Sequence, residues 1–525
     1  MKALSSPFRS LALVTALVAL HASCSLIADS QLEGKPSAST SSSGKGGTGG
    51  DGAGSVGGAG SGGAIPCDGT CLASETCCSG ACFDLEKSSD HCGSCDKACI
   101  AGEKCCGGGT CAACCDATDC PTADHQCIGG ACILMCTNPA VDCGDECAIL
   151  ATTTKHCGSC ENDCLSGHPC IAGKCQAGWA MMNQDGAPAP RQRAAATWTG
   201  KALFVWGGKG DQGALGDGAL YDPKTDTWSP LPTDNAPSPR MDAVAVLIDN
   251  QRVMVWGGGP HDDNVGLNSG KLYDLVTSTW TDLPVSVIGR RNPVAAWTGS
   301  RVLIWGGTSG GAAIAGGAYY DPAMTKWTMM SNPNSPTART GVGWAWSGQE
   351  LLLFGGRPGG VGATADGFGY NPETNVWRKL PTPAMLEPRF DTFVAWTGTS
   401  MLVFGGRDIA TTYANAALYA PATDAWTSAK TNPLGKRSAP APRAGCASSG
   451  SSQILVAGGL DQWEAIKTDG RVYDSVVNDW GAQIPAWPSG VDHEYGVCVW
   501  TGAELILWSG FDSAQLVPVG ERYRP

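Results

Sequence analysis

An all-β fold, in the form of a seven-bladed β-propeller, is predicted for residues 176–525 by three repeating observations. Seven short apolar runs end in Gly-Gly or a close variant, and they lie 49 to 53 residues apart. A tyrosine follows each run after 14 to 16 residues, and a tryptophan follows the first six tyrosines after seven more. Short runs of β-forming residues, bounded by turn residues, fill each unit. This period fits a four-stranded blade, and a ring of blades buries sheet faces that a single blade leaves exposed.

The N-terminal segment 1–24 has the three parts of a secretory signal. Lys2 and Arg9 flank the start of an apolar run, Leu11 to Leu20, which is too short to cross a bilayer. Small residues and Cys24 follow, so the segment resembles a bacterial lipoprotein signal with Cys24 as the lipidated residue. His21 departs from that pattern, because a leucine usually stands there, and plain secretion is the alternative. Either route leads to an oxidising compartment, where disulfides form.

Residues 25–66 are mostly Ser, Gly, Ala and Thr, and they carry too little apolar surface to fold. We expect a disordered tether whose ends lie roughly 35–40 Å apart on average. Its predicted role is that of a spacer.

The segment 67–175 holds 24 of the 27 cysteines, and seven of them recur as a second series at a nearly constant offset. The two series are Cys78, Cys82, Cys92, Cys95, Cys99, Cys105 and Cys111, and Cys143, Cys147, Cys157, Cys160, Cys164, Cys170 and Cys175. A repeated framework in an exported segment with few apolar residues favours disulfides of undefined connectivity. Cys-x-x-Cys beside His91 or His156 leaves zinc as the alternative. The spacing also resembles the cysteine-rich repeats of bacterial surface proteins, which implies no activity.

Further positions repeat in phase with the Gly-Gly doublets. An arginine precedes each of the first six doublets at a nearly constant distance, and a histidine takes the seventh place. These residues are Arg191, Arg240, Arg290, Arg339, Arg389, Arg443 and His493. The order of apolar strand, Gly-Gly, Tyr and Trp resembles the kelch repeat over residues 176–525. The resemblance implies a β-propeller like the central domain of galactose oxidase.

The seventh unit lacks a tryptophan strand, because Tyr523 is the third residue from the end of the sequence. Trp179 lies upstream of the first unit, and its sequence distance to Arg191 equals the distance from Trp228 to Arg240. We therefore predict that the strand around Trp179 is the outermost strand of the seventh blade, beside the strand of Tyr523. The cysteine-rich segment would then emerge from the face that carries the short turns.

Strands a to d are counted from the propeller axis outward. The b–c and d–a loops share the long-loop face, where we expect binding, and the a–b and c–d turns share the short-turn face. The six arginines and His493 begin strand a, near the axis on the long-loop face. Two interpretations are open: each arginine pairs within its own repeat, or together they form an anion-binding mouth. Trp463 and Trp487, which fall outside the repeat, are predicted ligand anchors on this face, and Trp344 is predicted to be core.

The sequence contains no nucleophile–base motif, phosphate loop or zinc-protease signature, so we predict no catalytic residue, cofactor or metal. A galactose-oxidase-like copper site needs two His and two Tyr, one of them crosslinked to Cys. The propeller has only His261 and His493, in different blades, while Cys446 and Cys498 are predicted to be buried thiols. A carbohydrate-active enzyme of galactose-oxidase-like or sugar-isomerising type remains the alternative function.

The favoured function is that of an exported, surface-anchored binding protein. Its expected partner is an extracellular protein or glycan, with anionic groups as one option. A formal net charge of −13 argues against a nucleic-acid partner. The lipid anchor is the only expected membrane contact, and the predicted location is the outer membrane, facing the cell surface or the periplasm, or else the secreted fraction.

Overall fold

The computed structural model describes residues 71–525 except 73, 79–80, 93, 96, 102, 107–109, 121–124, 129–130, 145, 162, 165–167, 263–264, 286–287, 360–361, 440–445 and 449. The predicted signal segment with Cys24, the tether, the side chain of Cys78, and Arg443 lie outside the described residues. In the described part of the chain, we find no helix with the length and apolar character needed to cross a membrane.

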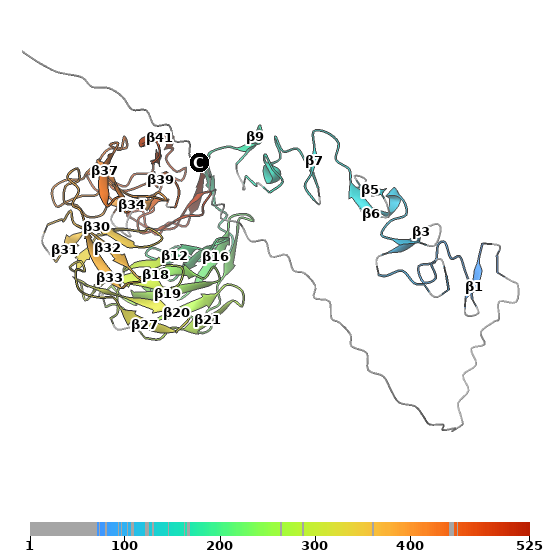
Figure 1. Cartoon of the computed structure of the whole chain (residues 1–525), viewed down its shortest axis with the longest axis horizontal. Helices are drawn as coiled ribbons and strands as arrows, with labels where there is room; N and C mark the ends of the chain where they lie inside the picture. The colour runs from blue at the N-terminus through green and yellow to red at the C-terminus, as the bar shows by residue number, and fades with distance from the viewer. Residues whose placement is uncertain are drawn as a thin grey trace, which may run out of the picture.

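Seven four-stranded antiparallel sheets surround a central axis, which confirms the predicted propeller (Figure 1). In the first six sheets the strands follow one another in chain order from the axis outward, so their connections are short and local. The first six blades are β12(Ala195–Trp198) β13(Leu203–Trp206) β16(Gly218–Asp222) β17(Thr227–Pro230); β18(Met241–Ile248) β19(Arg252–Gly259) β20(Gly270–Asp274) β21(Thr279–Asp282); β22(Val294–Trp297) β23(Val302–Trp305) β26(Gly317–Asp321) β27(Lys326–Met329); β29(Gly343–Trp346) β30(Leu351–Phe354) β32(Gly367–Asn371) β33(Val376–Leu380); β34(Phe393–Trp396) β35(Met401–Phe404) β36(Ala416–Ala420) β37(Ala425–Ala429); and β38(Cys446–Ala447) β39(Gln453–Ala457) β40(Gly470–Asp474) β41(Asp479–Ile484). Blade 7 combines β42(Val497–Trp500), β43(Leu505–Trp508) and β44(Gly520–Arg524) with β11(Gly178–Met181).

The cores of the propeller lie between neighbouring blades. Strand β13, for example, is buried along its whole length, and its Phe204 and Trp206 pack against Val253, Tyr273 and Trp280 of blade 2. Because both faces of a b strand are covered, its sequence is a continuous apolar run rather than an alternating one.

The in-phase aromatic residues are packing elements, as predicted. Within each blade the Tyr of strand c and the Trp of strand d face each other, with ring centroids 4.9–5.3 Å apart. The indole of strand d also reaches the preceding blade: Trp280 donates to the Pro232 carbonyl at 2.8 Å. The same bond recurs for Trp228, Trp327, Trp426 and Trp480. Each of these tryptophans therefore joins two blades.

The ring closes as predicted, through strand β11. Trp179 lies opposite Tyr523 in the β11–β44 register, and the two rings are 5.1 Å apart. The Trp179 indole donates to the Pro485 carbonyl at 2.8 Å, which is the bond that five of the other d-strand tryptophans make. The C-terminus accordingly lies where the cysteine-rich region joins the propeller (Figure 1).

The Gly-Gly doublets are needed because the chain turns there against the next blade. Gly207 has φ +65°, and a Cβ at this position would lie 2.5 Å from the Arg240 carbonyl oxygen. Blade 7 has Ser509 at this position, also with positive φ. Its hydroxyl accepts a hydrogen bond from the Arg191 amide at 2.8 Å and donates to the Val517 carbonyl at 2.9 Å. These two bonds accommodate the serine.

The cysteine-rich region is a series of small hairpins held by disulfides. Three hairpins share one arrangement, in which each strand carries a cysteine bonded to the preceding loop: β3(Lys104–Cys106) with β4(Thr110–Ala112), β5(His125–Ile128) with β6(Ala131–Leu134), and β9(Cys170–Ile171) with β10(Lys174–Cys175). Their bonds are Cys92–Cys105 and Cys99–Cys111, Cys114–Cys127 and Cys120–Cys132, and Cys157–Cys170 and Cys164–Cys175. Only the first and third copies were predicted from the sequence.

The cysteine-rich region contacts the short-turn face, as the closure implies. Arg524, at the short-turn end of β44, donates to the Asp163 carbonyl at 2.8 Å. One cysteine prediction was wrong: Cys498 of strand β42 is disulfide-bonded rather than a free buried thiol.

Candidate functional site

The arginines that begin strand a, which we call the arginine ring, are built into the blades and are not open to a ligand. Arg191, Arg240, Arg290, Arg339 and Arg389 are each at most 3% exposed. Every guanidinium donates to the carbonyl of the first doublet glycine in its own blade, at 2.8–3.1 Å. A buried cation needs hydrogen-bond partners, and these bonds supply part of the pairing while they also hold the doublet turn. The pairing interpretation therefore describes these arginines, and the described structure offers their charge to no ligand.

Polar groups of the b–c loops complete this pairing. Arg191 bonds Asp217 at 3.0 Å, and Arg339 bonds Asp366 at 2.6 Å. Burial lowers the pKa of the Arg240, Arg290 and Arg389 guanidinium groups to about 10, so they remain charged at neutral pH. The loops on the long-loop face are thus tied to the start of strand a in each blade.

In blade 6 the ring position belongs to Arg437, not to Arg443. Arg437 donates to the Gly458 carbonyl at 3.0 Å and to Asp469 at 2.6 Å, matching the other arginines. It stands 21 residues before the doublet, against 16 or 17 in other blades, because blade 6 carries an insertion. In blade 7 the His493 Nδ1–H donates to the Ser509 carbonyl at 2.6 Å. Burial lowers the pKa of His493, so its imidazole is neutral at pH 7.

A second ring, which the sequence analysis missed, links the blades around the axis. Two positions after the ring arginine, the backbone adopts the left-handed conformation, as at Arg193, Asp242, Asn292 and Asp391. The amide of one such residue donates to the carbonyl of its counterpart in the preceding blade, for example Asp242 to Arg193 and Asn292 to Asp242, both at 3.0 Å. Asn and Asp tolerate this conformation better than most residues, which was the available signal.

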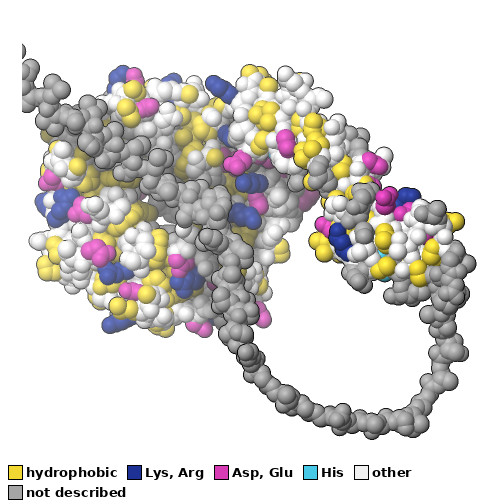
Figure 2. All heavy atoms as spheres, turned by 45° about the vertical axis from the view of Figure 1, so that its right-hand side comes forward, with side chains coloured by type: hydrophobic (Ala, Val, Ile, Leu, Met, Phe, Trp, Pro, Cys, Tyr) yellow, Lys and Arg dark blue, Asp and Glu magenta, His cyan; other side chains and the backbone are white. Residues whose placement is uncertain are grey.

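Charges on this second ring are also paired. Asp242 is buried and accepts hydrogen bonds from Arg193 at 2.8 Å and from Arg291 at 2.9 Å. Burial raises the pKa of the Asp242 carboxyl, but the two arginines outweigh it, so the pKa lies below its ordinary value. Basic and acidic side chains are likewise interspersed over the propeller surface visible in Figure 2.

The b–c loops of blades 5 and 6 form an open pocket of about 290 Å³ on the long-loop face, which we call the blade 5–6 pocket. It is lined by residues 407–412 and 461–464. Trp463 is 79% exposed and Ile409 is 75% exposed, so two of the residues that line this pocket are large, exposed apolar side chains. Arg407 spans the two loops, bonding Glu464 at 2.8 Å and Asp391 at 3.0 Å.

Two predicted roles for tryptophans were wrong. Trp487, a predicted ligand anchor, is only 5% exposed and packs edge-on against Trp179, with ring centroids 6.2 Å apart. Its indole donates to the Val491 carbonyl at 2.8 Å, so it is part of the closure. Trp344, predicted to be core, is 38% exposed and lines cavities along the propeller axis.

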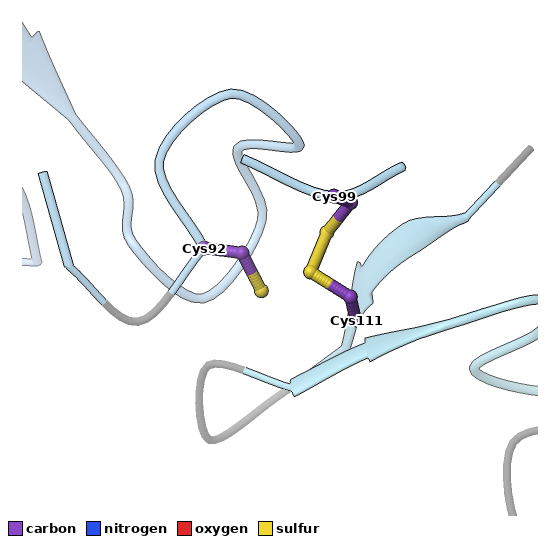
Figure 3. A group of neighbouring side chains, drawn as sticks. All are labelled: Cys92, Cys99 and Cys111. Carbon is purple, nitrogen blue, oxygen red and sulfur yellow. A yellow bond between two sulfur atoms is a disulfide. The ribbon is translucent and has the colours of Figure 1, made fainter. Parts of the chain in front are cut away.

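The cysteine groups with metal-like geometry are accounted for by disulfides. Cys92, Cys99 and Cys111 bring their sulfurs within 4.8 Å of one another, as do two equivalent groups. Figure 3 shows Cys99 bonded to Cys111, and Cys92 is bonded to Cys105. Because each of these thiols is consumed in a disulfide, none is available as a thiolate ligand. The His156 Nδ1 bonds the Cys160 carbonyl, and His91 does the same at 2.6 Å to Cys95.

The chain belongs to the kelch-repeat family. Residues 171–297 and 292–510, which cover more than half of it, match the family described as the KLHDC2/KLHL20/DRC7 Kelch-repeats domain. Kelch propellers generally mediate interactions with protein partners.

Two relatives are similar to part of the chain. The dynein alpha chain of the flagellar outer arm from Chlamydomonas reinhardtii is 31% identical over 147 residues, which are 26% of this chain and 3% of that protein. Adagio protein 3 from Arabidopsis thaliana is 28% identical over 177 residues, which are 30% of this chain and 29% of that protein. The chain thus spans less than a third of the length of either relative.

Proposed function

We propose that the chain is an exported binding protein whose propeller captures a protein partner at the blade 5–6 pocket. The main evidence for this proposal is the pair of exposed apolar side chains, Trp463 and Ile409, on neighbouring loops. Tryptophan is the residue type most often found at the energetic centre of protein interfaces. An exposed indole beside a pocket on a rigid scaffold supports this role.

The proposed partner presents an apolar or aromatic side chain rather than an acidic patch. The pocket contains Asp408, Asp461 and Glu464 against Arg407, and the latter is already paired. The ring arginines are buried, so they add no free positive charge at this face. An acidic ligand would therefore meet net repulsion at the pocket.

We further propose that the protein works in an oxidising, exported location, with Cys24 as its lipid anchor. The numerous disulfides support export, since reduced compartments do not maintain them. The contact between Arg524 and Asp163 puts the cysteine-rich region against the short-turn face. In this arrangement the blade 5–6 pocket points away from the membrane. We propose no enzymatic activity.

Site-specific photo-crosslinking in the producing cell tests the binding face. A photoreactive phenylalanine replaces Trp463 in one variant and Val276 in the other; Val276 is similarly exposed but lies in a c–d turn of the short-turn face. We expect a discrete protein adduct from position 463 and none from position 276. Adducts from position 276 alone, or no adduct from either, would refute the proposal. A screen for copper-dependent sugar oxidation by the same protein would support the enzymatic alternative if it gave turnover.

A further inference from the structure

One position in the innermost strands breaks the sevenfold repeat. In each blade, strand a pairs with the apolar run of strand b. The residue of strand a that lies opposite the third residue of this run marks an equivalent position in every blade. In blade 1 it is Ala196, opposite Val205, and in blade 4 it is Trp344, opposite Leu353. The seven equivalent residues are Ala196, Ala245, Ala295, Trp344, Val394, Ala447 and Cys498. Six blades therefore have a small or medium side chain where blade 4 has the largest one.

This tryptophan faces open space at the axis. It lines three cavities of about 520, 260 and 130 Å³, and more than a third of its surface is exposed. Among the described residues, no aromatic ring contact involves Trp344, in contrast to the strand d tryptophans, each of which packs on a tyrosine. Its indole therefore presents a free apolar surface to the cavity instead of filling the core.

The remaining lining consists of apolar side chains, neutral polar groups and two charged residues, Arg339 and Asp391. Both charges are paired, Arg339 with Asp366 and Asp391 with Arg407. Ala196, Ala245 and Ala295 form one wall of the largest cavity, and Trp297 and Trp346 lie toward its short-turn end. Asn292, Thr308 and Thr340 lie toward the long-loop face.

Thr392 lines the smallest cavity, and its buried hydroxyl has no hydrogen-bond partner in the described structure. The nearby carboxylate of Asp391 is paired with Arg407, and that of Asp242 with Arg193 and Arg291. A ligand in this space would meet an indole face, hydroxyl and amide groups, and no unpaired charge.

We propose that this axial cavity binds a neutral sugar ring, stacked on Trp344 and hydrogen-bonded by the hydroxyl of Thr392 and the polar groups toward the long-loop face. A pyranose combines an apolar C–H face with a rim of hydroxyls, which matches an indole surrounded by neutral polar groups. The combined space lies within the usual range for small-molecule sites. The sugar is either free or the terminal residue of a glycan. The axial cavity shares no lining residue with the blade 5–6 pocket, so sugar binding there does not depend on partner capture at that pocket.

Binding of neutral monosaccharides to the full-length, disulfide-bonded protein tests the proposal. Saturation-transfer difference NMR with glucose, galactose, mannose and N-acetylglucosamine identifies the sugar, and calorimetry gives its affinity. Trp344→Ala should weaken binding at least roughly tenfold, as expected for loss of an aromatic stacking partner. Thr392→Val should weaken it by roughly threefold to tenfold through loss of one hydrogen bond. Val276→Ala, in a c–d turn that does not line the cavity, should leave the affinity unchanged.

Two further comparisons make the result decisive. Trp344→Ala should melt within about 2 °C of the wild-type protein, because alanine occupies the equivalent position in other blades. A much larger loss would make Trp344 a packing residue and overturn the proposal, as would indole binding in preference to every sugar, or no binding at all. Methyl glycosides distinguish the two sources: a site for glycan ends accepts a sugar methylated at its anomeric oxygen, whereas a site for free sugar rejects it.

Discussion

Replacing Trp179 with alanine should weaken the whole propeller, because this side chain fastens the ring. The indole makes one hydrogen bond, to the Pro485 carbonyl, and ring contacts with Tyr523 and Trp487. The hydrogen bond contributes about 1 kcal/mol, and each aromatic pair about 0.5–1.5 kcal/mol. Loss of the half-buried apolar surface adds about 1 kcal/mol. The free energy of unfolding should therefore fall by about 3–5 kcal/mol.

Blade 5 offers a matched control within the same chain. Trp426 is also partly exposed, donates to the Pro381 carbonyl at 2.7 Å, and contacts Tyr419 and Phe354, each with centroids 5.2 Å apart. Trp426→Ala removes the same set of interactions from a blade whose four strands are continuous in the chain. The two substitutions should therefore cost similar amounts if β11 is a true outer strand.

Urea unfolding of the disulfide-intact protein, followed by circular dichroism and tryptophan fluorescence, measures both costs. Coincident transitions by the two probes are needed for a single free energy to be meaningful. A role for Trp179 in closing the ring is refuted if Trp179→Ala unfolds within about 0.5 kcal/mol of the wild-type protein while Trp426→Ala is destabilised by the expected amount.

Substitutions at three other positions test the roles of buried polar groups. Arg389→Ala should destabilise the propeller by about 3–5 kcal/mol, because it leaves loop carbonyls unpaired; unchanged stability in urea unfolding would argue that the guanidinium is held for a ligand instead. Ser509→Ala should cost about 1–3 kcal/mol, since the Arg191 amide and the Val517 carbonyl lose their shared partner; Ser509→Gly, the residue of the other blades, should cost less, and the reverse order would contradict this bridge. Burial raises the pKa of the Glu504 carboxyl from 4.5 to about 7, so the folded state retains a proton that the unfolded state loses. Stability should fall by up to about 3 kcal/mol as pH rises through that window, and urea midpoints of Glu504→Gln should lack this fall.

The fold was predictable because each blade repeats the same packing with the same residues. A buried b strand requires a continuous apolar run, and the turn that follows requires positive φ, which Gly-Gly supplies. The spacing from Trp179 to Arg191 identified the closing strand, because every d–a connection has to cover a similar path to the next axis strand.

The arginine ring shows where spacing stops being informative. Arg443 has nearly the same sequence distance to its doublet as the other ring arginines, and Arg437 does not. The physical requirement is a hydrogen bond to the Gly458 carbonyl, and an insertion between the two residues leaves that bond intact. Sequence distance was therefore the wrong criterion in the blade with an insertion.

Whether these arginines meet solvent also depends on tertiary structure. A cation at the start of strand a could bind a ligand or pair with groups of its own loops. The b–c loops fold over the arginines and supply the hydrogen-bond partners, so the second arrangement is the one that forms. The exposures of Trp344 and Trp487 were missed for a related reason. In the sequence, these two tryptophans could be recognised only as residues outside the repeat. The strand register was needed to show that Trp344 stands where blade 1 has the axial residue Ala196.

The position of the non-covalent joint in the ring explains how a single strand register keeps the propeller closed. Blades 7 and 1 are connected by the chain itself, since β11 leads directly to β12. The non-covalent joint lies inside blade 7, between β11 and β44, and is made of backbone pairs. Side chains alternate between sheet faces, so a slip of one residue would turn Trp179 away from both Tyr523 and the Pro485 carbonyl. The indole thus selects the single register in which the ring closes, and the sheet hydrogen bonds then hold it.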